Sequence, residues 1–326
     1  MKSLLAALFP SDCRICRASL FSVSRLPVCA SCMQSLEPIR QARCNVCGHV
    51  LPPDDATYGD ACCGECSIEG PAFERAVNYG AYRGVLRQLI HLLKYQRVRV
   101  AANPLGRLTA EACLQLEGDV DVPELLMIPV PTHKLRMRSR GFNQAELIAR
   151  SAQRGIEASI GRRVKLDVTA LLRVRFAESQ VALNAEQRRQ QIRGAFKVIS
   201  ESVKGREILL VDDVLTTGAT ASECARELRL AGAARVWVAT PARALGRDAD
   251  LGDMGRSEPE AVSASESRRL FEPSLSGKSL SGNSLSGTAQ ETLLRRRGIL
   301  LTHGEQRVGG QRPRAACSED YANGES

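Results

Sequence analysis

The chain has 326 residues, of which 44% are hydrophobic, and 45 Lys and Arg against 36 Asp and Glu give it a formal net charge of +9. These values exclude a wholly disordered or collagen-like chain, and the length is sufficient for about two domains. The longest early apolar run covers residues 3–9 and stops at Pro10 with no small-residue cleavage site. A membrane helix needs roughly 18 or more apolar residues, so we expect no membrane span, no secretion signal and a cytoplasmic protein.

Nine of the twelve cysteines lie before residue 67, and eight of them form four pairs with two residues between the partners. Such a gap lets both thiolates of a tight turn face one tetrahedral ion, so two pairs complete a four-cysteine zinc site. We predict two structural zinc ions with pairing in sequence order, although an interleaved pairing also fits the spacing. The alternatives are a disulfide framework, which is typical of small secreted chains, and a redox or iron-sulfur role. The predicted ligands are Cys13, Cys16, Cys29 and Cys32 for one ion, and Cys44, Cys47, Cys63 and Cys66 for the other.

The composition of the chain changes twice, which predicts three parts. Residues 1–70 form a zinc-ribbon module. Residues 71–243 alternate helical and strand patterns, which indicates an α/β domain with a parallel sheet and flanking helices. Residues 244–326 repeat Ser-Leu-Ser-Gly three times and keep no helical or strand period, so we predict a low-complexity, disordered tail. This tail has 11 basic and 12 acidic residues, which leaves a net charge of +10 on residues 1–243.

Apolar spacing and turn residues place the elements of the α/β domain. A helix is expected around residues 85–93, a strand at 125–130, a basic loop at 131–140 and a helix at 142–154. A second strand is expected at 208–211, followed by a helix at 221–230 and a short strand at 236–239.

Two aspartates, Asp212 and Asp213, follow the apolar run 208–211 directly. Ligands of open α/β sheets bind at the carboxyl ends of strands, and the next turn leads into a helix whose N–H groups form an anion site. This stretch is similar to the PRPP-binding motif of type I phosphoribosyltransferases. The resemblance implies that Asp212 and Asp213 bind the ribose hydroxyls. It also implies that the 5′-phosphate is bound by Thr216, Thr217, Gly218, Ala219 and Thr220.

The basic loop after the strand at 125–130 is a second predicted site. It carries four cations within seven residues, which suits a strongly anionic group such as pyrophosphate. A solvated basic surface is the alternative. In the type I enzymes the loop at this position contacts pyrophosphate, and Mg2+ bridges substrate oxygens there. The predicted contacts are Lys134, Arg136, Arg138 and Arg140, with His133 as a further contact or a structural residue.

Separate motifs in one order narrow the resemblance to the ComF family of bacteria. They are the four cysteine pairs, Leu93-Lys94-Tyr95, Pro129-Val-Pro131-Thr-His133, Arg140-Gly-Phe-Asn-Gln144 and the Asp212-Asp213 stretch. The resemblance covers about residues 1–243. It implies a zinc ribbon joined to a type I phosphoribosyltransferase-like domain, and a role in natural competence with incoming DNA.

The long loop before the second strand departs from the family pattern. A threonine ahead of a glutamine is usual, whereas Ala177 precedes Gln180, and Arg188 is followed by Gln191 in place of the usual asparagine. In type I enzymes this loop closes over the transition state and excludes water. Gln180 and Arg188 are therefore the only candidates for catalytic residues, and turnover is less well supported than binding.

Three functions fit these motifs. The first is an enzyme that transfers phosphoribose from PRPP, with Mg2+, to a nitrogen acceptor and releases pyrophosphate. The second is a PRPP- or nucleotide-sensing accessory protein without catalysis, working with a DNA-uptake helicase partner or on incoming DNA. The third is a zinc-dependent protein that binds single-stranded DNA, for which the charge of +10 is favourable but the few aromatic residues are not.

Overall fold

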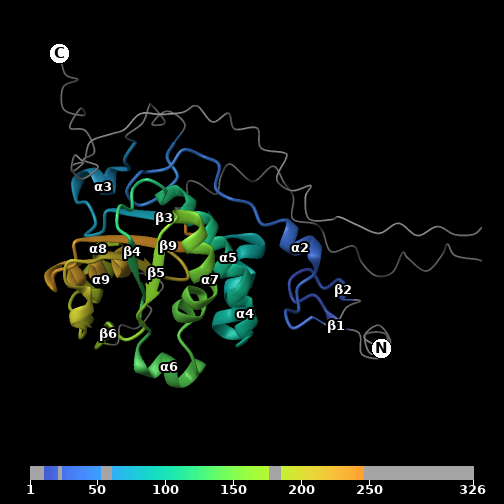
Figure 1. Cartoon of the computed structure of the whole chain (residues 1–326). Helices are drawn as coiled ribbons and strands as arrows, with labels where there is room; N and C mark the ends of the chain where they lie inside the picture. The colour runs from blue at the N-terminus through green and yellow to red at the C-terminus, as the bar shows by residue number, and fades with distance from the viewer. Residues whose placement is uncertain (1–10, 21–23, 53–60, 176–184, 246–326) are drawn as a thin grey trace, which may run out of the picture. The chain divides into compact units, whose positions relative to one another are not determined.

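The computed structural model describes residues 11–20, 24–52, 61–175 and 185–245 (Figure 1). Most of the predicted tail, from residue 246 onward, lies outside the described residues. No helix of the described ranges is both long and apolar enough to cross a membrane.

The centre of the structure is a five-stranded parallel sheet in the order β3-β9-β8-β4-β5. All residues of β8 are buried, as expected for a parallel strand covered on both faces. The side chains of β4 alternate between two hydrophobic cores, one on each face of the sheet. The strands are β3 (Arg75–Ala81), β4 (Glu124–Pro129), β5 (Arg163–Leu166), β8 (Glu207–Val211) and β9 (Arg235–Arg243).

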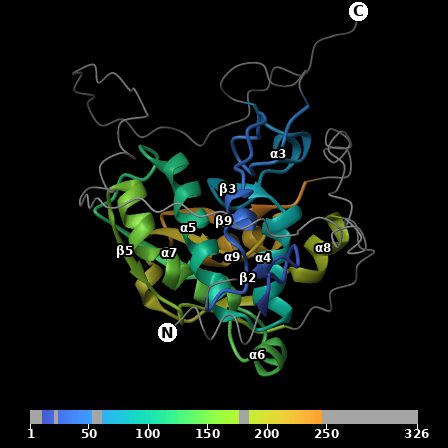
Figure 2. The same ribbon diagram turned by 90° about the vertical axis from the view of Figure 1, so that its right-hand side faces the viewer.

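Helices cover both faces of this sheet (Figures 1 and 2). The helices α4 (Gly84–Tyr95), α5 (Ala102–Ala112) and α7 (Gln144–Ile160) bury their apolar faces in the first core. The second core receives α9 (Ala219–Leu230), α8 (Ala185–Ile192) and the antiparallel hairpin of β6 (Leu171–Arg173) and β7 (Phe196–Val198). Short 3₁₀ turns cover Arg99–Ala101, Cys113–Leu116 and Glu201–Val203.

Two small ribbons built around the cysteines precede the sheet. The first contains β1 (Ser11–Asp12), β2 (Ser19–Leu20) and α2 (Ala30–Gln34), and the second contains α3 (Gly64–Ile68). Cys13, Val28 and Cys32 of the first ribbon belong to the core beneath α4, α5 and α7. Cys44, Val46 and Leu51 of the second ribbon belong to the core beneath α9. Each ribbon therefore packs on a different face of the sheet.

The predicted fold class is confirmed, with differences in the elements. The helix expected at 142–154 runs from Gln144 to Ile160, and the strand expected at 236–239 extends over Arg235–Arg243. The expected loop at 131–140 is largely a helix, α6 (Lys134–Arg140). Its Lys and Arg residues favour helix, the His133 side chain caps its first turn, and Gly141 ends it at a φ of 80°.

Candidate functional site

The candidate ligand site lies where the sheet changes its direction of winding. From β4 the chain crosses through α7 to β5, whereas from β8 it crosses through α9 to β9 on the opposite side. Such a switch point opens a crevice at the carboxyl ends of the two strands. Pro129 is in register with Val211, and the Val130 N–H donates to the Val211 carbonyl at 2.9 Å. The acidic stretch after β8 and the basic stretch after β4 therefore begin side by side.

Asp212 and Asp213 begin the turn after β8 and are stabilised unequally. Lys94, from the last turn of α4, lies 2.9 Å from the Asp213 carboxylate through its Nζ. Burial by itself would lower the Lys94 pKa, but the charges of both aspartates and the hydrogen bond to Asp213 raise it. Burial and the neighbouring charge of Asp213 raise the pKa of Asp212 to about 7. The carboxylate Oδ1 of Asp212 accepts from the Asp213 N–H at 2.8 Å.

The segment from Thr216 to Thr220, here called the phosphate loop, leads directly into α9. Gly218 has a φ of 77°, a left-handed conformation that favours glycine, and it is the N-cap of the helix. Thr217 Oγ1 accepts from the Ala219 N–H at 3.4 Å. The N–H groups at the start of a helix can bind an anion, and those of α9 follow directly after this turn.

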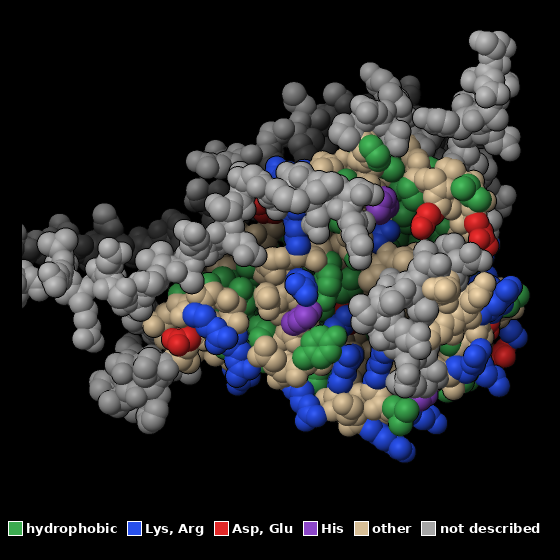
Figure 3. Space-filling view, turned by 180° about the vertical axis from the view of Figure 1, so that it is seen from behind, with side chains coloured by type: hydrophobic (Ala, Val, Ile, Leu, Met, Phe, Trp, Pro, Cys, Tyr) green, Lys and Arg blue, Asp and Glu red, His purple; other side chains and the backbone are tan. Residues whose placement is uncertain are grey.

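The basic helix α6 is linked to this turn through Arg173, which lies near both Arg136 and Asp212. Burial and the charge of Arg136 lower the pKa of Arg173, in β6. The charge of Asp212 acts in the opposite direction and raises it. Two arginines between α4 and α5 hold the end of α6, since Arg97 donates to the Ser139 carbonyl at 2.6 Å and Arg99 to that of Gly141 at 3.3 Å. Lys and Arg side chains gather along the lower edge of Figure 3, where Figure 1 places α6.

The two proposed loop residues cannot be positioned. Gln180 lies outside the described residues. Arg188 falls within α8, but its side chain is likewise outside the description. Both remain predictions.

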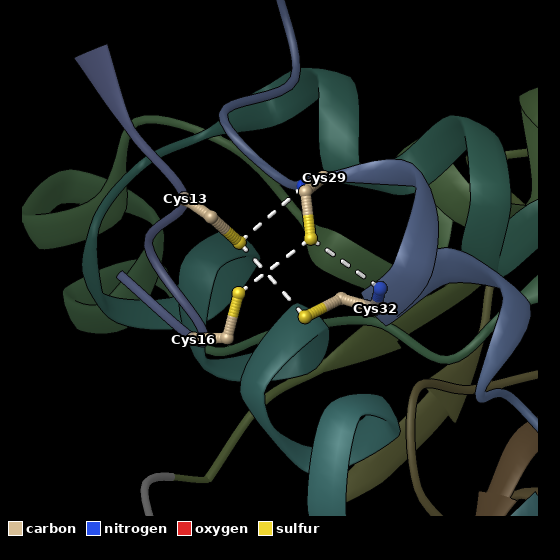
Figure 4. Close-up of side chains that lie close together, drawn as sticks. All are labelled: Cys13, Cys16, Cys29 and Cys32. Atoms are coloured by element: carbon tan, nitrogen blue, oxygen red, sulfur yellow. Dashed lines mark hydrogen bonds between the residues drawn. The ribbon is translucent and has the colours of Figure 1, made fainter. Parts of the chain in front are cut away.

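The eight cysteines form two clusters of four in sequence order, and within each cluster all sulfur atoms lie within 4.8 Å of one another. The first pair of each cluster sits in a turn that ends with a positive φ, at Arg17 or Gly48. The second pair begins a short helix, α2 or α3, at its N-cap cysteine. The interleaved pairing is thereby excluded. The clusters are Cys13, Cys16, Cys29 and Cys32 (Figure 4), and Cys44, Cys47, Cys63 and Cys66.

The sulfur geometry fits zinc. Tetrahedral Zn2+ with bonds of about 2.3 Å requires sulfur atoms about 3.8 Å apart. The distance is 3.9 Å between Cys13 and Cys32, 3.5 Å between Cys16 and Cys29, and 3.6 Å between Cys47 and Cys63. The Cys29 and Cys32 amides also donate to sulfur atoms, at 3.3 and 3.4 Å, which stabilises thiolates. Each cluster is therefore a structural zinc site.

Comparisons with known proteins agree with this assembly. Residues 4–67 match the model of the double zinc ribbon domain. The chain is 32% identical over 231 residues to DNA utilization protein YhgH of Escherichia coli O157:H7, covering 70% of this chain and 95% of the relative. It is 30% identical over 241 residues to Competence protein F of Haemophilus influenzae, covering 72% and 98%. The chain belongs to the ComF family.

A comparison of structures matches the glutamine PRPP amidotransferase of B. subtilis, complexed with ADP and GMP, at a TM-score of 0.25 and 22% identity. The match covers 43% of this chain and 26% of that chain. At that score the likeness adds nothing to the fold described above.

Sequence reasoning did not assign three residues of the site. Lys94 was noted as part of a motif without a role, and Arg173 and Arg243 were not singled out. Their distance along the chain hides their role, because they approach this turn only in the folded chain. Lys94 pairs with Asp213, Arg173 lies near Asp212, and Arg243 donates to the carbonyls of Leu215 and Thr216. For Lys94 the available signal is a basic residue directly after a predicted helix, whereas Arg243 lies four residues beyond the predicted strand and has no such signal.

Proposed function

We propose that the crevice at the carboxyl ends of β4 and β8 binds PRPP with Mg2+. The observation that supports this most is the order of groups along one turn: Asp212 and Asp213 suit ribose hydroxyls, and the phosphate loop at the start of α9 suits the 5′-phosphate. The cations of α6 suit the pyrophosphate end. Mg2+ would neutralise part of the pyrophosphate charge, and the carboxylates that would face it are those of Asp212 and Asp213.

The reaction that fits such a site is transfer of phosphoribose. A nitrogen of the acceptor forms a bond to ribose C1, while the bond from C1 to the pyrophosphate oxygen breaks and pyrophosphate leaves with the electron pair. The chain's residues would position the two reactants and stabilise the leaving anion. Binding of PRPP without turnover, as a sensor, is the alternative. In either form we propose that the protein acts in DNA uptake or utilization, in keeping with the names of its relatives.

Calorimetric titration of PRPP with Mg2+ into the zinc-loaded full chain tests this proposal. We expect micromolar binding that the Asp212→Asn, Asp213→Asn double variant loses. An uncharged amide oxygen accepts hydrogen bonds from ribose hydroxyls, and coordinates Mg2+, more weakly than a carboxylate does. The matched control is Asp167→Asn, an aspartate whose hydrogen bonds to Thr169 and Ser202 belong to a different turn. Absence of binding by the folded wild type would refute the proposal. If PRPP binds, a test for pyrophosphate release in the presence of an added nucleobase distinguishes an enzyme, which releases it, from a sensor, which does not.

A second candidate function, binding of single-stranded nucleic acid, is favoured by an exposed aromatic residue. Tyr95 at the end of α4 is 65% exposed, and the guanidinium of Arg140 lies 5.5 Å from its ring centroid. His91 lies edge-on to the same ring, with centroids 5.1 Å apart. An exposed ring among cations is the arrangement on which bases stack. Tyr95 follows Lys94 directly in the chain, so a nucleic-acid strand stacked on its ring would have one end near the crevice.

Replacing Tyr95 by Ala should weaken binding of a fluorescent oligothymidylate by about 5- to 150-fold, since base stacking contributes about 1–3 kcal/mol. Tyr95→Phe keeps the ring and should bind like the wild type. Both variants leave the surrounding charge unchanged, so an equal affinity of Tyr95→Ala and Tyr95→Phe in fluorescence anisotropy would contradict a stacking role.

A further inference from the structure

Arg243, the last residue of β9, joins the second ribbon to the segment before α9. It is only 5% exposed. Its Nε donates to the Cys47 carbonyl at 3.2 Å, and its Nη2 lies 3.9 Å from the Cys47 sulfur. Its Nη1 donates to the carbonyls of Leu215, at 3.1 Å, and Thr216. One planar side chain therefore contacts both a zinc ligand and the first residue of the phosphate loop.

The groups near Arg243 that can carry negative charge belong to the second ribbon: Cys47, and Glu65 and Glu69, which line the same cavity as Arg243. None of the ion pairs between described residues includes Arg243. A buried guanidinium without a negative neighbour is strongly destabilising. Four thiolates around one Zn2+ carry a net charge of about −2. With zinc bound, these thiolates place negative charge 3.9 Å from the Arg243 Nη2, at the Cys47 sulfur.

The second ribbon also forms one wall of a cavity beside the phosphate loop. This cavity has a volume of about 90 Å³ and is lined by Cys47, Cys66 and Phe73, and by Thr217, Gly218 and Arg243. The Ala72 N–H, just beyond the second ribbon, donates to Ser222 Oγ of α9 at 3.1 Å. Movement of this ribbon would consequently displace the residues at the start of α9.

We infer that Arg243 couples the second zinc centre to the phosphate loop, so that zinc bound there fixes the loop for the phosphate end of the ligand. This inference rests on the proposed function. Coupling of binding is reciprocal, so bound PRPP should strengthen zinc binding at the second centre by the same factor as zinc strengthens PRPP binding. We therefore expect zinc to leave this centre more slowly when PRPP is bound. Arg243 is a positioning residue and touches neither zinc nor ligand.

The first zinc centre provides an internal control. It packs in the core on the opposite face of the sheet, and its ribbon reaches the α/β domain through Arg14, which donates to Gln96 Oε1 at 2.8 Å. No hydrogen bond or ion pair between described residues links its four cysteines to residues 216–220. Its zinc should therefore be insensitive to PRPP.

The experiment measures cysteine alkylation in the zinc-loaded full chain with a chelator present, read separately for each centre by mass spectrometry. With saturating PRPP and Mg2+, we expect alkylation of Cys47 and Cys66 to slow at least about 5-fold and that of Cys16 and Cys29 to stay unchanged. Arg243→Met should abolish this protection. Arg235→Met, the same change at the other end of β9, should retain it, because the Arg235 guanidinium pairs with Glu207 and makes no described hydrogen bond to the second ribbon. Equal protection in both variants would overturn the inference.

Hydrogen exchange separates a failure of the inference from a failure of the proposed function. Without any ligand, amides of residues 215–220 should exchange at least about 5-fold faster in Arg243→Met and in a Cys63→Ser, Cys66→Ser variant that lacks the second zinc. The cysteine variant keeps Arg243 and Cys47, so it carries the test if Arg243→Met does not fold. If the wild type does not bind PRPP, the proposed function fails and this exchange still decides the coupling. Unchanged exchange in the zinc-free variant would overturn the inference even if PRPP binds.

Discussion

Replacing Lys94 by Met is expected to lower the free energy of unfolding by about 3 kcal/mol near neutral pH. Lys94 and Asp213 are 17% and 12% exposed, and their charged atoms are 2.9 Å apart. Removing the ammonium leaves Asp213 beside Asp212 with little water to solvate either carboxylate. The Asp212 pKa, which the charge of Lys94 lowers, should rise further. Urea denaturation of the zinc-loaded chain at pH 7.5 measures the loss.

A double-mutant cycle assigns this effect to the ion pair. Adding Asp213→Asn to Lys94→Met removes the unpaired charge, so we expect most of the lost stability to return. The matched control is Arg150→Met, which breaks an exposed pair with Glu146 whose Arg side chain is 54% exposed. Such surface pairs contribute less than about 1 kcal/mol. If Lys94→Met lowers the free energy of unfolding no more than Arg150→Met does, the pair of Lys94 and Asp213 does not stabilise the fold.

The parts of the fold that the sequence predicted are those with local signals. The run 208–211 is apolar at every position because β8 is buried on both faces, and the cysteine pairs are spaced by the geometry of a zinc turn. The strand β3 was not predicted, since it contains Asn78 and Gly80 in a buried position. Asn78 is tolerated there because its Oδ1 accepts from Thr240 Oγ1 on the neighbouring strand at 2.7 Å. That partner is 162 residues away in the chain.

The candidate site likewise has a part with local sequence signals and a part without them. The acidic pair and the phosphate loop lie within nine residues of one another, so their order alone predicts a site. The role of Lys94 depends on the packing of α4 against the sheet, and that of Arg243 on a ribbon 196 residues earlier in the chain. The close approach of the second ribbon to β3 also explains why position 48 is a glycine, which no local sequence pattern predicts. A Cβ on Gly48, whose φ is +69°, would lie 2.3 Å from the Asn78 Nδ2, so only glycine allows the second ribbon to approach β3.

Replacing Asp212 by Asn is expected to stabilise the folded chain at pH 8, by on the order of 4 kcal/mol. Burial and the charge of Asp213 raise the folded pKa of Asp212 to about 7, whereas an unfolded aspartate titrates near about 3.9. Between these values the folded state binds a proton that the unfolded state does not, so the contribution of Asp212 to stability falls as the pH rises. Above pH 7 the folded chain carries a disfavoured carboxylate that Asn removes. The melting temperatures of both proteins from pH 5 to pH 8.5 should converge toward the acidic end.

Asp167 supplies a control of opposite sign. Burial opposes its ionisation, but hydrogen bonds from Thr169, Ser202 and the Ala170 amide outweigh it, so the Asp167 pKa is lowered. Asp167→Asn should therefore destabilise the chain at pH 8, and the difference should shrink only in acid below about pH 4. A pH-independent effect of Asp212→Asn would contradict the raised pKa. A residue whose replacement increases stability while abolishing PRPP binding is one retained for its ligand, and this combination would distinguish a working site from an inherited turn.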